Sequence, residues 1–401
     1  VVQGLLVVPV QEQQFLVQDL VLCQVQIVLM LFITSCSTKT KKQGIANVKK
    51  TDTMSKDSLD IAVNEMMKKY KVPGVSVGII KSGKLDTTFC YGLLEEKAEH
   101  KINPNTLFSV GSISKFVNAL LVLELVENEK LDLDTDVNQY LRDWKVETNE
   151  FSKKSPVTLR HILSHTAGFS VHGFANYYPN ESLPSTLQIL NGDKPAKNDK
   201  VELIHPVGAE YDYSGGGITV SQKIIEDVTG LTYEKVSQEL LFKPLNLTRT
   251  SFENPLPSSL GNIAKAHDKN GKITSLPRGY QAMPEKAAAG LWTTPSDLSK
   301  LIELIVFDNE FISADLRESM TTRAENSEFG LGLYVDDLDG KKVVVHNGVN
   351  DSYGAKFNLY WDEKAGYIIF ANGTNGYEMI RELRIPFETY IGVFENYNKT
   401  E

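Results

Sequence analysis

The chain has 401 residues, 41% of them hydrophobic and 23% charged, a composition that suits one large globular domain or two fused lobes. Its 42 basic and 51 acidic residues give a formal charge of -9, and no basic stripe stands out. Because phosphate neutralisation needs such a stripe, we expect no nucleic-acid partner. Three cysteines, Cys23, Cys36 and Cys90, are too few for a disulfide framework or a zinc cage, so we expect no metal site.

Residues 1 to 36 are apolar and glutamine-rich, and the densest apolar run extends from Ile27 to Ile33. A short apolar run that ends in small residues before a cysteine is typical of a bacterial lipoprotein signal, although no Lys or Arg precedes this one. We therefore predict an exported protein of the periplasm or cell envelope that is anchored to lipid through Cys36. The alternative is an ordinary signal peptide in which Cys36 is incidental. Residues 37 to 54, rich in Lys, Thr and Ser, are predicted to form a flexible tether.

The segment after the tether shows first a helical and then a strand pattern. Apolar residues recur with a helical period from Ser55 to Tyr70, and Val75 to Ile80 and Thr87 to Gly92 are predicted to form a hairpin. The run Gly74 to Gly78 matches the nucleophile-elbow pattern of α/β-hydrolases, which requires a strand, a sharp turn and a helix. Its Ser76 lies inside a strand instead, so we predict that Ser76 is not a nucleophile.

The segment from Phe108 to Asn118 places Ser112 and Lys115 three residues apart. On a helix such residues share a face, and the apolar run from Phe116 to Leu125 predicts a helix buried on most sides. A serine nucleophile must lose its proton to a base, but a free lysine, with a pKa near 10.4, is already charged at neutral pH. Either burial lowers the lysine pKa, or the charged lysine assists a second base such as a tyrosine. The spacing alone is common by chance in a chain of this length.

Two histidines and one tyrosine follow. His161 and His165 in the predicted short helix Thr158 to Gly168 have metal-ligand spacing, but Ile follows His161 where a zinc-protease motif has Glu. We therefore predict packed, hydrogen-bonded histidines. Residues 169 to 205 are predicted to form a long loop or lid. Tyr213 then stands on a glycine-rich turn before a helix predicted from Val220 to Thr229, where a phenol can serve as the second base.

The carboxyl-terminal part returns to strands, predicted at Val343 to His346, Ala355 to Trp361 and Tyr367 to Ala371, and a helix that includes Ile380 and Ile391 follows them. Strands at both ends with helices between them predict an α/β (α+β) fold. In it, an antiparallel sheet built from both chain ends is flanked by helices and carries an inserted, mostly helical lobe. We place the sheet lobe at about 55–108 and 290–395 and the helical lobe at about 109–289.

These motifs together resemble the serine β-lactamase and penicillin-binding-protein superfamily, in particular its class C-like branch of esterases, D-aminopeptidases and carboxypeptidases. The resemblance covers residues 55–395 and implies a β-lactamase/transpeptidase-like domain over that range. It rests on six ordered segments: Pro73 to Val77, Phe108 to Lys115, Thr158 to Gly168, Tyr213 with its glycine turn, Gly290 to Trp292, and His346 to Gly348.

The resemblance also implies roles for individual residues. Ser112 matches the acylated nucleophile, Lys115 its partner, and Tyr213 the first residue of the Tyr-x-Asn motif. The backbone N–H groups of Ser112 and Val349 would form the oxyanion hole. Substrate-binding positions correspond to His346, Asn347 and Gly348, which stand where many relatives have Lys-Thr-Gly, and to Gly215.

Two of these positions depart from the family pattern. Gly215 replaces the asparagine of the second motif, and His346 replaces a lysine that would be a fixed cation. Both changes weaken a site that grips the carboxylate of penicillin or of a terminal D-alanine. We therefore predict a serine hydrolase that forms an acyl-enzyme on ester or amide bonds of a small molecule or peptide, such as an esterase or a D-amino-acid peptidase or carboxypeptidase. It needs no cofactor. The alternatives are a β-lactamase proper and a penicillin-sensing lipoprotein that is acylated without turnover.

Overall fold

The computed structural model describes residues 53–274, 282–307 and 311–394, all within a compact unit from Thr51 to Glu401. The predicted signal segment 1–36, with Cys36, and the tether as far as residue 52 lie outside the described residues. Within the described ranges, no helix has both the length and the apolar character needed to cross a membrane.

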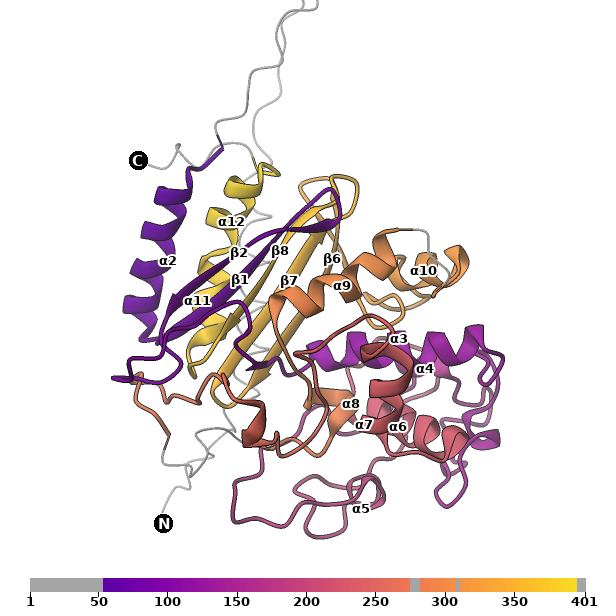
Figure 1. The fold of residues 1–401 in the computed structure, drawn as a ribbon. Helices are drawn as coiled ribbons and strands as arrows, with labels where there is room; N and C mark the ends of the chain where they lie inside the picture. The colour runs from indigo at the N-terminus through magenta and orange to yellow at the C-terminus, as the bar shows by residue number, and fades with distance from the viewer. Residues whose placement is uncertain (1–52, 275–281, 308–310, 395–401) are drawn as a thin grey trace, which may run out of the picture. The chain divides into compact units, whose positions relative to one another are not determined.

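A six-stranded antiparallel sheet forms the centre of this unit, with the order β2-β1-β8-β7-β6-β5 (Figure 1). The amino-terminal hairpin joins the carboxyl-terminal strands through β1 and β8, with Val75 opposite Ala371. The predicted sheet from both chain ends is therefore confirmed. The strands are β1 (Gly74–Lys81), β2 (Lys84–Gly92), β5 (Tyr334–Leu338), β6 (Lys341–Asn350), β7 (Tyr353–Tyr360) and β8 (Ala365–Ala371).

One face of the sheet, called here the back face, packs against α2 (Lys56–Tyr70), α11 (Gly376–Glu382) and α12 (Arg384–Ile391) (Figure 1). The predicted single closing helix is two helices that meet at Leu383. Pro386 lies in the first turn of α12 and has no backbone N–H to bond to the preceding turn, which gives a physical reason for the break.

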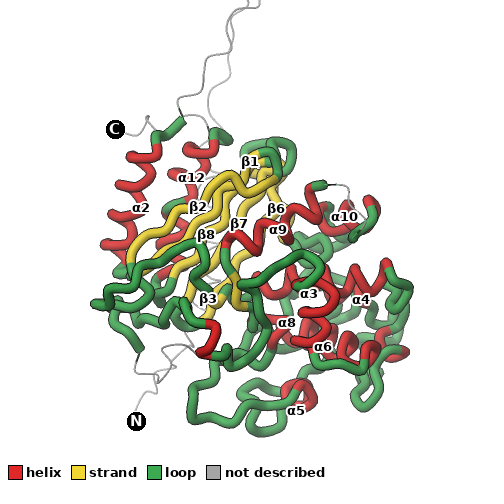
Figure 2. Tube along the Cα trace, viewed as in Figure 1, coloured by secondary structure: helices red, strands yellow, loops and turns green. Residues whose placement is uncertain are grey.

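The other face, called here the catalytic face, packs against α9 (Pro295–Val306) and α3 (Ile113–Glu127), and α6 (Gly215–Thr229) and α8 (Lys286–Ala289) pack on α3. Figure 2 shows helices on both sides of the strand layer. Nearly every side chain of α3 is buried, as the apolar run predicted. The predicted helix from Val220 in fact begins at Gly215, where Ser214 Oγ caps it by accepting from Gly217 N at 2.9 Å.

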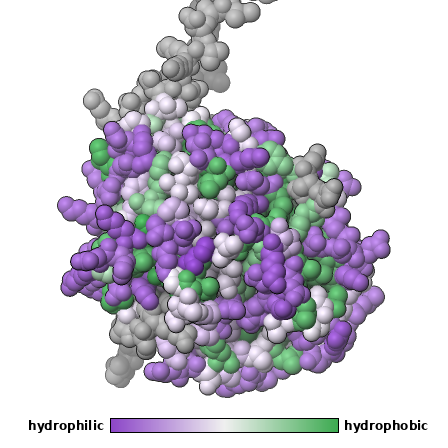
Figure 3. All heavy atoms as spheres, viewed as in Figure 1, coloured by the Kyte–Doolittle hydropathy of each residue, from purple (hydrophilic) through white to green (hydrophobic). Residues whose placement is uncertain are grey.

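Shorter elements complete the chain. They are β3 (Phe108–Ser109), β4 (Trp292–Thr293), α4 (Leu159–Leu163), α5 (Thr186–Asn191), α7 (Tyr233–Ser237) and α10 (Ala314–Thr321). The sequence patterns did not predict β5, α9 or α10, and the predicted loop over 169–205 contains α5. On the face shown in Figure 3, hydrophilic side chains dominate and hydrophobic ones occur in small scattered groups, so that most apolar residues are left for the cores.

Candidate active site

Ser112 stands at the point where the chain leaves β3 and enters α3. Gly111 makes the turn with a φ of +51°, a conformation that favours glycine. Ser112 is the N-cap residue of α3, but its side chain makes no capping hydrogen bond. The hydroxyl of Ser114 is used instead to fix the turn, donating to Gly111 O at 2.6 Å. The Ser112 side chain therefore remains partly exposed at the head of a buried helix.

Lys115 lies one helical turn further on and is only 2% exposed. Its Nζ donates to Ser112 Oγ at 3.1 Å and to Ala288 O, in α8, at 2.8 Å. The same Nζ lies 4.8 Å from the centroid of the Tyr213 ring. In the part of the chain that the structure describes, no carboxylate forms an ion pair with Lys115. The structure thus brings together all three side chains to which the sequence assigned the proton transfer.

Two glycines allow β6 to approach the nucleophile closely. A Cβ atom added at Gly348 would lie 1.8 Å from Val110 O and 3.0 Å from Ser112 N, and one added at Gly111 would lie 2.7 Å from Val349 N. No side chain fits at either position. The backbone N–H groups of Ser112 and Val349, the predicted oxyanion hole, therefore belong to two segments in direct backbone contact.

His346 lies on the catalytic face of β6 and is 3% exposed. Burial, together with the nearby positive charge of Lys115, lowers the pKa of His346 to about 3. It is therefore a neutral group at physiological pH and not the weak cation that its sequence position suggested. Asn347 follows on the strand, and because side chains alternate along β6, its side chain points to the other face of the sheet from His346. At the site Asn347 contributes its backbone carbonyl, which lies 2.8 Å from His346 Nδ1.

Gly215, at the position of the family asparagine, has no space for a larger side chain. A Cβ atom there would lie 2.8 Å from Phe174 Cε2 and 3.3 Å from His172 O. An aromatic ring from the loop before α5 and a backbone carbonyl thus occupy the space that a side chain at position 215 would need.

Sequence reasoning did not assign Ala288, Phe174 or His165 to the site. Ala288 contributes only a carbonyl oxygen, and Phe174 comes from a loop with no periodic pattern, so neither has a sequence signal of its own. His165 belongs to a motif that was recognised, but its metal-ligand spacing was the only role considered. As predicted, both histidines of that motif are bonded to protein groups: His161 Nδ1 lies 3.0 Å from Thr158 Oγ1, and His165 Nδ1 accepts from Ser214 N at 3.3 Å.

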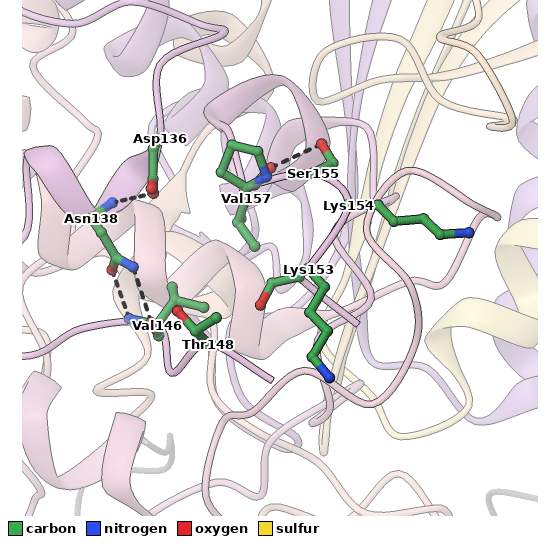
Figure 4. A pocket seen from close by; sticks show the side chains of 10 residues that line it. Asp136, Asn138, Val146, Thr148, Lys153, Lys154, Ser155 and Val157 are labelled. Carbon is green, nitrogen blue, oxygen red and sulfur yellow. Dashed lines mark hydrogen bonds between the residues drawn. The ribbon is translucent and has the colours of Figure 1, made fainter. Parts of the chain in front are cut away.

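Among the described residues, no group of three or more His, Cys, Asp or Glu side chains could hold a metal ion. A cavity of about 180 Å³ lies in the segment between Asp136 and Val157, and its lining includes Asn138, Lys153 and Ser155 (Figure 4). None of the residues named above as part of the Ser112 site lines this cavity.

Comparison with known proteins agrees with this geometry. The Beta-lactamase family profile matches residues 59–385, so the chain belongs to the Beta-lactamase family. "Protein flp" of Staphylococcus aureus (strain MRSA252) is 24% identical over 342 residues, which make up 80% of this chain but only 64% of that relative. "Teichoic acid D-alanine hydrolase" of Staphylococcus aureus is 27% identical over 300 residues, covering 74% of this chain and 70% of the relative.

The fold is also that of a solved relative. The octameric penicillin-binding protein homologue from Pyrococcus abyssi superposes with a TM-score of 0.68 at 23% identity, over 84% of this chain and 79% of that one. The family match and the fold place the domain in the β-lactamase and penicillin-binding-protein superfamily, as the sequence motifs indicated.

Proposed function

We propose that this chain hydrolyses an ester or amide bond in two steps through an acyl-enzyme on Ser112. The observation that carries the proposal is the 3.1 Å contact between Lys115 Nζ and Ser112 Oγ at a buried helix start. Among the residues that the structure describes, the hydrogen-bond acceptors of this lysine are the neutral Ser112 Oγ and Ala288 O, and the Tyr213 ring lies beside it. A structural lysine in such a place would normally have a carboxylate partner.

In the first step the Ser112 oxygen bonds to the substrate carbonyl carbon, and its proton passes to the pair formed by Lys115 and Tyr213. The carbonyl oxygen, now negative, accepts from the backbone N–H groups of Ser112 and Val349. The bond to the leaving group then breaks, and Tyr213 returns the proton to the departing oxygen or nitrogen. A water molecule, deprotonated by the same group, cleaves the acyl-enzyme and restores the Ser112 hydroxyl.

We propose esters or amides of D-amino acids as the substrates, on the strength of the relative described as a teichoic acid D-alanine hydrolase. Two features of the site disfavour a β-lactamase proper. The neutral His346 gives no fixed positive charge for a penicillin carboxylate. The ring of Phe174 beside Gly215 gives no amide to hold a penicillin side chain.

The test is a substrate screen on the domain without residues 1–36. D-alanyl methyl ester, D-alanine p-nitroanilide and a chromogenic cephalosporin are compared, with the Ser112→Ala variant as the control. We expect turnover of the ester or the anilide that exceeds turnover of the cephalosporin by at least about 100-fold and is lost in Ser112→Ala. Hydrolysis that survives Ser112→Ala overturns the proposal. A single stoichiometric burst, with a stable adduct found by mass spectrometry, favours the non-turnover sensor instead.

We further propose that the protein is exported and bears lipid on Cys36. The support is the sequence pattern alone: an apolar run from Ile27 to Ile33 followed by small residues and a cysteine. Expression of the full chain in bacteria fed an alkyne fatty acid tests it. Label on the protein that disappears in Cys36→Ser is the expected result, and equal labelling of both rejects the proposal.

A further inference from the structure

We propose that His165 is a positioning residue that fixes Tyr213 against Lys115 and Ser112, an inference that rests on the proposed function. The motif around His165 was recognised in the sequence, but the reaction described above gives it no task. In the structure His165 is only 2% exposed, and its ring lies next to that of Tyr213.

His165 holds the backbone on both sides of Tyr213. Its carbonyl oxygen accepts from Asp212 N at 2.8 Å, and its Nδ1 accepts from Ser214 N at 3.3 Å. The residues before and after Tyr213 thus each donate their backbone N–H to the same residue of another segment. A shift of His165 would therefore move the tyrosine as a whole.

The imidazole also holds the phenol ring. The ring centroids of His165 and Tyr213 lie 4.3 Å apart with an interplanar angle of 38°. Phe329 packs edge-on against the imidazole at 4.9 Å and supports it. Lys115 Nζ lies 4.8 Å from the centroid of the same Tyr213 ring, so the imidazole and the lysine together restrict where the phenol can lie.

The hydrogen bond from Ser214 N also decides which imidazole nitrogen carries the proton. Nδ1 accepts, so in the neutral ring the hydrogen is on Nε2. Burial first, and then the charge of Lys115, hold the pKa of His165 well below its usual value, which keeps Nδ1 free to accept. A histidine here combines a flat ring, tilted against the phenol, with a nitrogen acceptor for the Ser214 N–H.

The backbone of His165 explains part of its identity. Its φ of +57° lies in the left-handed region, which Asn and Asp, as well as His, adopt more readily than most residues. Asn is therefore the substitution that keeps both the backbone conformation and an acceptor near Nδ1, while it removes the ring. Phe keeps the ring and removes the acceptor.

A double-mutant cycle tests the proposal. His165→Phe is expected to lower kcat/KM for the best substrate by about 10- to 100-fold, because a small displacement of a proton-transfer group costs about that much. In a Tyr213→Phe background the same substitution should cost less than about 2-fold, since there is no phenol left to position. His165→Asn should retain more activity than His165→Phe. For variants whose substrate turnover is too slow to measure, the rate at which a fluorophosphonate labels Ser112 replaces kcat/KM.

His161→Asn is the matched control, because the same substitution one turn earlier removes a ring that contacts Thr158 and not Tyr213. It should leave kcat/KM within about 2-fold of the parent. An equal loss from His165→Phe with and without the Tyr213 phenol, or an equal loss in His161→Asn, overturns the positioning role. If His165→Phe does not fold, the same cycle with His165→Asn decides. Failure here leaves the proposed function standing, whereas hydrolysis by Ser112→Ala removes both.

Discussion

Buried polar groups lie on both faces of the central sheet, and they are partnered differently. On the back face, Glu388 of α12 is fully buried, accepts a hydrogen bond from the Tyr360 hydroxyl, and lies 3.2 Å from Arg384 Nη1. Next to it, Asn358 Nδ2 donates to the Tyr367 hydroxyl at 3.1 Å. There a buried carboxylate has a cation and a phenol as partners, although Glu388 Oε2 and Asn358 Oδ1 accept no hydrogen bond.

On the catalytic face the corresponding groups are left incomplete. Lys115 is bonded to neutral oxygens, and the Nε2 atoms of His165 and His346 are buried without a hydrogen-bond partner. A buried charge without a counterion costs stability, so a chain that pairs Glu388 with Arg384 on one face has a reason for leaving Lys115 without a carboxylate on the other. The difference indicates that the back face is polar for stability and the catalytic face is polar for chemistry.

The largest effect should come from Lys115→Met. We expect kcat/KM to fall by at least about 1,000-fold, because Tyr213 loses the positive charge beside it and Ser112 loses its hydrogen-bond partner. The Tm should be unchanged or higher, since a buried ammonium without a counterion is replaced by an apolar chain of similar length. Ester hydrolysis and thermal unfolding measure the two. A fall in Tm without a fall in activity would show that Lys115 serves the fold.

Glu388→Ala should show the opposite pattern. Removal of the carboxylate leaves Arg384 and the Tyr360 hydroxyl without their partner, and the free energy of unfolding should fall by about 2 to 3 kcal/mol. Activity per folded molecule should not change. Urea unfolding and an active-site titration by fluorophosphonate separate the two quantities, and reduced kcat in correctly folded enzyme would contradict the division between the faces.

Acid should affect the catalytic face through His346. Its pKa of about 3 in the folded protein lies below the usual value near 6.5, so between these values the unfolded chain binds a proton that the folded protein does not. The free energy of unfolding should therefore decrease as the pH falls below about 6.5, by up to about 1.4 kcal/mol per pH unit for this residue. His346→Gln should flatten that slope.

The smallest effect is expected for Ser76→Ala. Ser76 is fully buried in β1, and its Oγ lies 3.9 Å from Cys90 Sγ, a weak contact at most. We expect a change in stability under about 1 kcal/mol and unchanged hydrolysis of the best ester. A large loss of activity in this variant would contradict the prediction that Ser76 is not a nucleophile.

The sequence predicted those parts of the site in which the reacting residues lie a fixed number of positions apart on one helix. Ser112 and Lys115 share a helix face, and the apolar run behind them predicts their burial, so both could be placed without coordinates. Strand patterns at both chain ends likewise predicted the sheet. The three glycines from Gly215 suggested a turn, but they form the first turn of α6 because Ser214 caps it and the loop before α5 packs against it.

The remainder of the site depends on contacts between distant segments. His346 has an ordinary pKa in an unfolded chain and becomes a permanently neutral group only through burial. Asn347 is its neighbour in sequence, yet strand alternation directs its side chain to the other face of the sheet. His165 contacts Tyr213, almost fifty residues later in the chain, and no local sequence pattern predicts such a contact.

The pairing of β1 with β8 also affects how the molecule is made. Val75 and Ala371 are strand neighbours, so the first hairpin cannot complete its hydrogen bonds until nearly the whole domain has left the ribosome. Until then β1 has an open edge and exposes residues that are almost all buried in the folded domain, a hazard for association with other chains. A chain that stops before β8 would lack the strand that joins the hairpin to the rest of the sheet, and should accumulate as aggregate although every residue of the Ser112 site is present.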